Sequence, residues 1–391
     1  MKSWLSRNLV LVTLVSLAQD AASELLYPLL PYIITAGVIG AAPIALGLIE
    51  GCAEAAAGFA KLISGKASDT YGRKPFIIAG YSIAGAGKAF IVIATSWPLV
   101  FLGRVTDRIG KGLRSAPRDA LINDSVTKAH VGRAFGFHRT GDNIGAVIGP
   151  LIAIAGLSLL NNDVRAVAKW ALIPAIISGL LTLFIKETVV KKSRTEKKLE
   201  PASVRTPLPI ALKKSIAVLV LIQLTNIPDA LLLLRLYDLH FSINGVVLTY
   251  ALYNFVTVIL AFPGGYLADR LPPQLIYVVG LLAFAIAYAT LGLTSSHAIA
   301  VLALMIYGAF PALTDGVGKA WIAKLSEDHH RGRAQGVFQG SMSFAILGAG
   351  IWGGAFWSKG STQPVLVVAA VGALFGAAFL TLGLIRERLT H

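Results

Sequence analysis

Long apolar segments alternate with short polar segments along the whole chain. A helix needs roughly 20 predominantly apolar residues to cross a bilayer, and this criterion predicts twelve membrane-spanning helices. They are expected near residues 8–36, 42–63, 76–95, 97–117, 132–157, 165–185, 212–238, 243–263, 275–294, 297–320, 333–357 and 364–385. The first apolar segment continues unbroken through Ile34, so we expect it to stay in the membrane and not to be cleaved as a signal peptide. The pattern predicts an all-α integral membrane protein.

The polar segments differ in charge between the two sides of the predicted bundle. Basic residues follow the even-numbered helices and are densest between 186 and 214, whereas the loops 37–41, 295–297 and 359–363 carry one lysine between them. The positive-inside rule therefore places both termini on the cytoplasmic side of the cell (inner) membrane. The long polar segment also divides the helices six and six. We expect a first bundle at 1–187, a cytoplasmic linker at 188–211 and a second bundle at 212–391.

Composition supports the membrane assignment. Of the 391 residues, 55% are hydrophobic and 14% are charged, against about 25% charged in a soluble domain. The mean hydropathy is +0.70. The net charge of +15 resides in loops between apolar segments, so it indicates topology and not nucleic-acid binding. One Cys and three Met exclude a disulfide framework and argue against a soft-metal pathway, and neither a metal nor a cofactor is expected.

The two halves carry an internal repeat. Four short patterns recur in the same order and at nearly constant separation: Gly65 to Asp69 with Gly265 to Asp269, Thr106-Asp107 with Thr314-Asp315, Gly132 to Gly136 with Gly332 to Gly336, and Ser23-Glu24 with Pro228-Asp229. Parallel six-helix repeats are related by an axis along the membrane normal, and their binding site is expected at the midplane between them.

Three motifs resemble those of the major facilitator superfamily, and the resemblance covers the whole chain. The segment Gly65-Lys-Ala-Ser-Asp69-Thr-Tyr-Gly72-Arg73-Lys74, read as a loop, resembles motif A, and Gly265 to Arg270 is its weaker copy, with Asp269 and Arg270. Arg104 and Gly110 resemble part of the fourth-helix motif. Gly141, Gly145, Gly149 and Pro150 resemble the fifth-helix motif that is frequent among antiporters, although Ala153 and Ile154 replace its usual glycine pair. The resemblance implies that Asp69 controls conformational exchange at the junction of the two halves.

Charged residues inside the predicted spans are candidates for function, because a charge at the bilayer centre costs about 2.5–3.5 kcal/mol. The proton-coupling candidates are Asp20 and Glu24, which lie one turn apart and repel each other when both are ionised, and Asp229. The repeat places Asp229 opposite Glu24, beside a helix break expected at Pro228. The substrate-binding candidates are Tyr27, Lys88, Arg104, Asp107, Lys111, His138, Arg139, Asp142, Arg235, Asp315 and Lys319. The structural alternative for Arg104 and Lys111 is a buried ion-pair set with Asp107. For Asp20 and Glu24 it is a permanent pairing with a base of the fourth or fifth helix. For His138 it is a hydrogen-bonded structural role, and for Asp315 and Lys319 it is an intrahelical pair. Glu50 and Glu54 are equally compatible with pathway and structure.

These features favour a secondary transporter of the major facilitator type, not an enzyme, working by rocker-switch alternating access. The sequence contains no phosphate-binding loop of the Walker type, so protons are the expected driving ion. The buried bases outnumber their evident partners, which favours a small anionic or zwitterionic solute, and the fifth-helix motif favours export. We expect a monomer. The alternatives are a passive uniporter, a transport-fold sensor without net flux, and a membrane-embedded enzyme acting on lipid-linked substrates.

Overall fold

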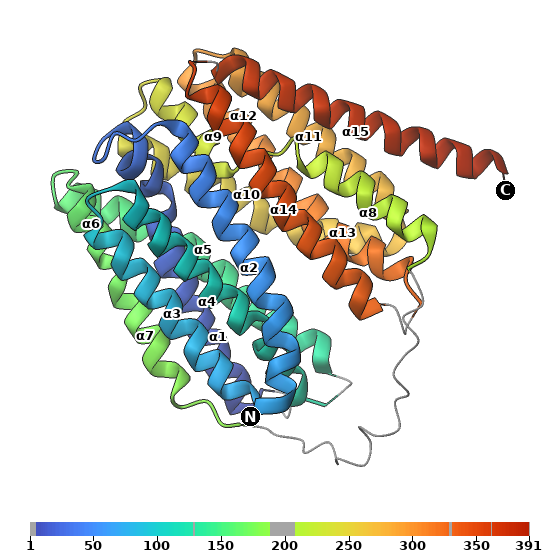
Figure 1. The fold of residues 1–391 in the computed structure, drawn as a ribbon, viewed down its shortest axis with the longest axis horizontal. Coiled ribbons are helices and arrows are strands. Elements are labelled where there is room, and N and C mark those ends of the chain that lie inside the picture. Colours follow the sequence, from blue (N-terminus) through green and yellow to red (C-terminus); the bar gives the residue numbers. More distant parts are fainter. Residues whose placement is uncertain (1–4, 128–129, 188–207, 328–330, 361, 391) are drawn as a thin grey trace.

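The computed structural model describes residues 5–127, 130–187, 208–327, 331–360 and 362–390 (Figure 1). The first half contains α1 (Arg7–Leu26), the short helices η1 (Tyr27–Leu29) and η2 (Tyr32–Ala36), α2 (Pro43–Tyr71), α3 (Arg73–Ile93), α4 (Trp97–Asp124), α5 (Val131–Leu159), α6 (Val164–Trp170) and α7 (Leu172–Thr182). The second half contains α8 (Ile210–Gln223), α9 (Asp229–Asp238), α10 (Ile243–Arg270), α11 (Pro273–Leu293), α12 (His297–Tyr307), α13 (Ala309–Lys324), α14 (Arg331–Trp357) and α15 (Thr362–Thr390). The part of the chain that the structure describes contains no strand.

The all-α membrane fold with twelve spans is confirmed when short consecutive helices are read as single spans. These compound spans are α1 with η1 and η2, α6 with α7, α8 with α9, and α12 with α13. Among the described residues, nine helices or continuous helix pairs are long and apolar enough to cross a membrane. Helix α4 is not among the nine, in keeping with the dense charge between Arg104 and Arg118. Of the predicted linker at 188–211, residues 188–207 lie outside the described residues.

The loop predicted for the motif A segment is wrong, because helix α2 continues through Tyr71. The residues Gly65 to Asp69 are therefore helical, and the chain turns only at Gly72, whose φ of 92° is favourable only for glycine. Its copy in the second half is helical too, since α10 continues to Arg270. The polar character of these segments marks the end of the apolar span but not the end of the helix.

The predicted break beside Pro228 is confirmed. Helix α8 ends at Gln223, and α9 begins at Asp229 directly after Pro228. Proline has no backbone N–H to donate to the preceding turn, so it ends one helix and readily precedes the next. The break leaves Asp229 in the first turn of α9, in the middle of a span.

Glycine stripes let helices approach closely at two places. In α5, a Cβ added at Gly149 would lie 2.6 Å from the backbone N of Leu25 and 2.7 Å from the carbonyl O of Ala21, both in α1. In α14, a Cβ at Gly354 would lie 2.9 Å from the Cα of Ile44 in α2. The close packing at Gly145 and Gly149 thus joins α5 to α1 within the first half. The stripe in α14 joins the two halves.

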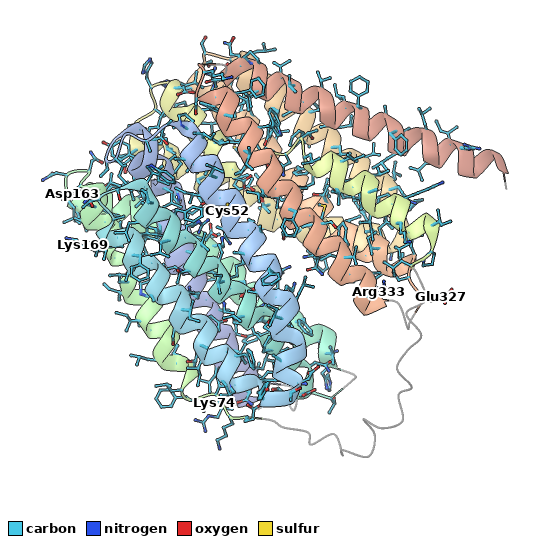
Figure 2. The ribbon with its side chains drawn as sticks, in the orientation of Figure 1. Cys52, Lys74, Asp163, Lys169, Glu327 and Arg333 are labelled. Atoms are coloured by element: carbon cyan, nitrogen blue, oxygen red, sulfur yellow. The ribbon has the colours of Figure 1, made fainter. Side chains whose placement is uncertain are left out.

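The two halves contact each other mainly through two helix pairs, α2 with α14 and α5 with α10. We call the side that carries Lys74, Asp124 and Glu187 the linker side, and the opposite side, which carries the 160–163 turn, the far side. Figure 2 shows Lys74 at one end of the first half and Asp163 with Lys169 at the other. The halves meet at the far side and diverge toward the linker side (Figure 1).

Candidate functional site

A cavity of about 530 Å³ lies between the two halves. Its walls come from α1, η1, α2 and α4 of the first half and from α8 to α11, α13 and α14 of the second, together with Tyr307 at the end of α12. The polar lining comprises Glu24, Tyr27, Glu50, Glu54, Arg108, Lys111, Gln223, Asn226, Asp229, Tyr250, Tyr253, Tyr277, Tyr307, Thr314, Asp315, Lys319, Gln339 and Ser343. Both halves therefore contribute charged groups to one space, as the repeat predicts.

Two of the three coupling candidates lie in this cavity, and tyrosine hydroxyls hold both. Tyr250 donates to Glu24 Oε2 at 2.6 Å. Tyr253 and Tyr307 donate to the two carboxylate oxygens of Asp229, each at 2.9 Å. The pairing of Glu24 with Tyr250 joins α1 to α10, so it crosses the boundary between the halves. Asp229 reaches the cavity because the break at Pro228 opens the span at that level.

The tyrosines were missed by the sequence analysis, apart from Tyr27. Tyr250 and Tyr253 are three residues apart in α10, a spacing that places both on one helix face. This face carries their hydroxyls to the carboxylates of Glu24 and Asp229. An isolated pair of tyrosines in an apolar span resembles ordinary packing, so only the position of α10 against α1 reveals the role.

Lys88, Arg104, Asp107 and Glu50 form a buried ion-pair network beside the cavity, and of the four only Glu50 lines it. Lys88 Nζ lies 2.5 Å from Asp107 Oδ1, and Arg104 makes a bidentate contact with Glu50 at 2.6 and 2.8 Å. Arg104 also contacts Asp107 at 3.4 Å, which links the two pairs. The side chains of Lys88 and Glu50 are 1% and 3% exposed. Three helices, α2, α3 and α4, are connected by this network.

The network removes the basis for expecting an excess of unpaired bases. Lys88 and Arg104 have carboxylate partners and do not line the cavity. Arg108 lines it, 3.2 Å from Glu54. Of the basic candidates, Lys111 and Lys319 line the cavity with exposed side chains. The lining has five carboxylates (Glu24, Glu50, Glu54, Asp229 and Asp315) and three bases (Arg108, Lys111 and Lys319). Acidic groups therefore predominate.

The remaining substrate candidates lie outside the cavity lining. Arg235 donates to the carbonyls of Leu291, Gly292 and Thr294 at 3.2–3.5 Å, where it closes the end of α11. His138 and Asp142 lie 3.6 Å apart within α5, and Arg139 is exposed.

Asp20, the third coupling candidate, lies 3.9 Å from Arg114 Nη2 and is likewise outside the lining. This contact fits the structural alternative of a carboxylate in helix 1 paired with a helix 4 base. Among the described residues, no three potential metal-binding side chains cluster.

The motif A segment contacts its own half at the linker side. Arg73 pairs with Asp124 and donates to the carbonyl of Ala120 at 2.7 Å. The backbone N–H groups of Arg73 and Lys74 donate to the carboxylate of Glu187 at 3.3 and 2.8 Å.

Of the remaining gating candidates, Asp69 is exposed at the end of α2, and Gly65 packs near Ala116 of α4. In the second half, the guanidinium of Arg270 lies 4.2 Å from the ring centroid of Tyr266. The side chain of Asp269 lies outside the described residues.

Known proteins of similar sequence include one described as a transporter and one described as a multidrug resistance protein. The chain is 28% identical over 387 residues to an uncharacterized MFS-type transporter of Methanocaldococcus jannaschii, covering 96% of this chain and 94% of that one. It is 24% identical to the multidrug resistance protein MdtH of Salmonella paratyphi B, covering 82% and 80%.

Solved structures show the same fold. A point mutant of the nucleoside transporter NupG superposes with a TM-score of 0.77 at 15% identity, over 96% of this chain and 99% of that one. A bacterial homologue of the human lysosomal transporter Spinster, in an inward-facing and unoccupied conformation, gives a TM-score of 0.75 at 17% identity, over 98% and 97%. The family model of the Major Facilitator Superfamily matches residues 12–237 and 215–390. With the repeat, the twelve spans and the cavity between two halves, this match shows that the chain belongs to the Major Facilitator Superfamily.

Proposed function

We propose that the protein is a secondary active transporter that carries a small solute by alternating access of the central cavity. The single observation that carries this proposal is the cavity itself, lined by both halves and containing carboxylates from each. Glu24 of the first half and Asp229 of the second are positioned by tyrosines of α10 and α12. A site built from both halves changes when the halves rock against each other, as alternating access requires.

The linker side is proposed to face the cytoplasm of a cell membrane. Basic residues such as Arg73, Lys74 and Lys186 lie on this side, in keeping with the positive-inside rule. Both termini would then be cytoplasmic, with the protein acting as a monomer. In this orientation the described conformation is closed at the outer face.

Protons are the proposed coupling ion, with Glu24 and Asp229 as carriers and Asp20 as the third candidate. A carboxylate is cheap to bury when protonated and costly to bury when ionised. Among the described residues, no basic nitrogen lies within 4 Å of Glu24 or Asp229, so each can change charge without leaving an ionised base behind. Asp20 faces Arg114 and is less suited to this role.

The cavity supports a zwitterionic solute in preference to an anionic one. Five carboxylates and three bases line it. Of these, Glu50 is paired with Arg104 and Glu54 with Arg108, while Lys88 is paired with Asp107 outside the lining. Export is the proposed direction, supported by the glycine stripe of α5 and by the relative described as a multidrug resistance protein. Motif A is proposed to control conformational exchange from the linker side. No enzymatic role is proposed.

Transport into proteoliposomes tests this function. Solutes that raise the thermal midpoint of the purified protein are selected first, and their flux is then measured with and without an imposed pH gradient. We expect gradient-driven accumulation by the wild type, and its loss in Glu24→Gln or Asp229→Asn with downhill exchange retained.

Two outcomes would contradict parts of the proposal. Unchanged accumulation in folded Asp20→Asn, Glu24→Gln and Asp229→Asn variants would exclude proton coupling through these residues. Downhill flux that ignores the gradient in the wild type would identify a uniporter, and binding without flux would identify a sensor.

A further inference from the structure

The far-side part of the cavity is lined by aromatic rings from four elements, η1, α10, α12 and α13. Tyr27 of η1 lies 5.4 Å from Tyr250 of α10, measured between ring centroids. Tyr250 and Tyr253 are 5.8 Å apart, and Tyr253 and Tyr307 are 5.5 Å apart with an interplanar angle of 12°. Phe310 continues the row at 5.8 Å from Tyr307. All five rings line the cavity, so they form one continuous aromatic wall.

The aromatic wall contains two carboxylates with hydroxyl partners in place of bases. Glu24 accepts from Tyr250, and Asp229 accepts from Tyr253 and Tyr307. These hydroxyls are neutral donors, which orient the carboxylates without cancelling their charge. Among the described residues, no Lys, Arg or His nitrogen comes within 4 Å of either carboxylate. Negative charge at this wall is therefore available to a ligand.

The cavity bases that lack a close carboxylate lie nearer the linker side. Tyr250 is in the third turn of α10, which starts at the far side with Ile243. Lys319 is in the last two turns of α13, which ends at the linker side with Lys324. At 1.5 Å per residue, these positions differ by roughly 20 Å or more in depth along their spans. The aromatic end of the cavity is thus acidic, whereas the other end carries Lys319 together with Asp315, which precedes it by one turn in α13.

Aromatic rings and unpaired carboxylates together recognise organic cations. Aromatic rings provide apolar contact, and their faces attract cations through the ring quadrupole. A carboxylate in a poorly solvated cavity attracts a cation more strongly than it would in water. An inorganic anion or a sugar phosphate would meet repulsion at this end.

We propose that the acidic aromatic end of the cavity binds the positively charged group of an organic cation that carries an apolar or aromatic body. The inference rests on the proposed transport function and names the substrate class of that same cavity. A carboxylate on the solute, where present, would lie toward Lys111 and Lys319. Glu24 and Asp229 supply the charge, and the tyrosines supply the contact surface.

Two probes of equal shape and opposite charge test the substrate class. Equilibrium binding of radiolabelled tetraphenylphosphonium and tetraphenylborate is measured on the detergent-purified protein, with empty micelles as the blank. We expect the phosphonium ion to bind at least about tenfold more tightly than the borate ion. Asp229→Asn should weaken phosphonium binding by about tenfold or more. Glu24→Gln is the second variant, which keeps the test informative where one substitution impairs folding.

Asp238→Asn is the matched control, because Asp238 lies on the same helix as Asp229 but at its far-side end, outside the cavity lining. Its phosphonium affinity should stay within threefold of the wild type. Borate binding equal to or tighter than phosphonium binding would overturn the proposal, as would phosphonium binding unchanged in both cavity variants. Phosphonium flux into proteoliposomes is measured in parallel. Selective phosphonium binding without flux would contradict the transport function while supporting the ligand class.

Discussion

At the scale of single residues, the membrane charges separate into two groups with different surroundings. Lys88, Asp107, Arg104 and Glu50 are buried and satisfy one another across three helices. Glu24 and Asp229 line the cavity and are held by neutral hydroxyls. The first arrangement fixes the helices of one half, whereas the second leaves charge available to a proton or a solute.

Replacing Lys88 by Met should therefore act on stability. The change leaves Asp107 with a single distant partner, Arg104 at 3.4 Å. Removing one member of a buried ion pair costs about 3–5 kcal/mol, so we expect a large fall in the thermal midpoint of the purified protein. Lys169→Gln, at an exposed lysine, is the control and should leave the midpoint unchanged. If the Lys88→Met protein has wild-type stability but impaired ligand binding, the structural role is wrong and Lys88 contacts the substrate.

At the scale of elements, the contact between α1 and α5 depends on the absence of side chains along one face of α5. A Cβ at Gly149 would meet three backbone atoms of α1 within 2.6–2.9 Å, so the helices would have to separate. Because Glu24 is on α1 beside this contact, the position of the carboxylate depends on the same packing.

Gly149→Ala should destabilise the protein by about 1–3 kcal/mol, the usual cost of overpacking. Gly179→Ala is a matched control in α7, where an added Cβ meets nothing within 4 Å. That control should be neutral or slightly stabilising, since Ala favours helix formation over Gly. Thermal unfolding of both variants gives the comparison. Equal midpoints would show that α1 and α5 adjust freely, against the close packing described here.

The motif A segment gives a second prediction at this scale. Asp69 is exposed at the linker-side end of α2, where the halves diverge. A carboxylate there can hold a helix N-terminus or a base when the linker side closes. Asp69→Asn should therefore slow exchange between conformations and leave ligand affinity within a few-fold, as measured by turnover and equilibrium binding. Collapse of affinity with a normal exchange rate would contradict the role.

Local sequence patterns predicted the spans, the helix break and the glycine contacts, because each depends on neighbouring residues in the chain. Pro228 lacks the backbone N–H that a continuous helix needs at that position, and the stripe at Gly145 and Gly149 allows a close partner helix. The charged residues of α4 between Arg104 and Arg118 were equally evident in the sequence. Its partners were not, because Glu50 and Lys88 come from α2 and α3 and meet it only in the folded bundle.

The contacts of the α10 tyrosines with the cavity carboxylates could not be predicted from the sequence either. Their contacts with Glu24 and Asp229 join residues separated by 226 and 24 positions. No local pattern specifies which helix faces α10 across the boundary between the halves. The excess of unpaired bases that favoured an anion in the sequence is absent for this reason, since it depended on which charges are paired.

At the scale of the whole molecule, neutral groups join the two halves at the far side, in addition to the pairing of Tyr250 with Glu24 inside the cavity. Asn244 of α10 donates to Asn162 at 2.9 Å, and the backbone N of Ile44 donates to Ser358 at 2.9 Å. The close approach of Gly47 to Gly350 lies between α2 and α14 in the same region. Neutral contacts of this kind are individually weak, so the far side can separate when the halves rock.

Cross-linking the far side tests this central claim most directly. Asn162→Cys and Asn244→Cys are combined with Cys52→Ala, which removes the one native cysteine, and solute flux is measured in proteoliposomes before oxidation, after oxidation and after reduction. Alternating access predicts that the disulfide abolishes flux while ligand binding to the purified protein persists, and that reduction restores flux. Each single-cysteine variant should transport under all three conditions. Undiminished flux with the far side fully cross-linked would contradict the account.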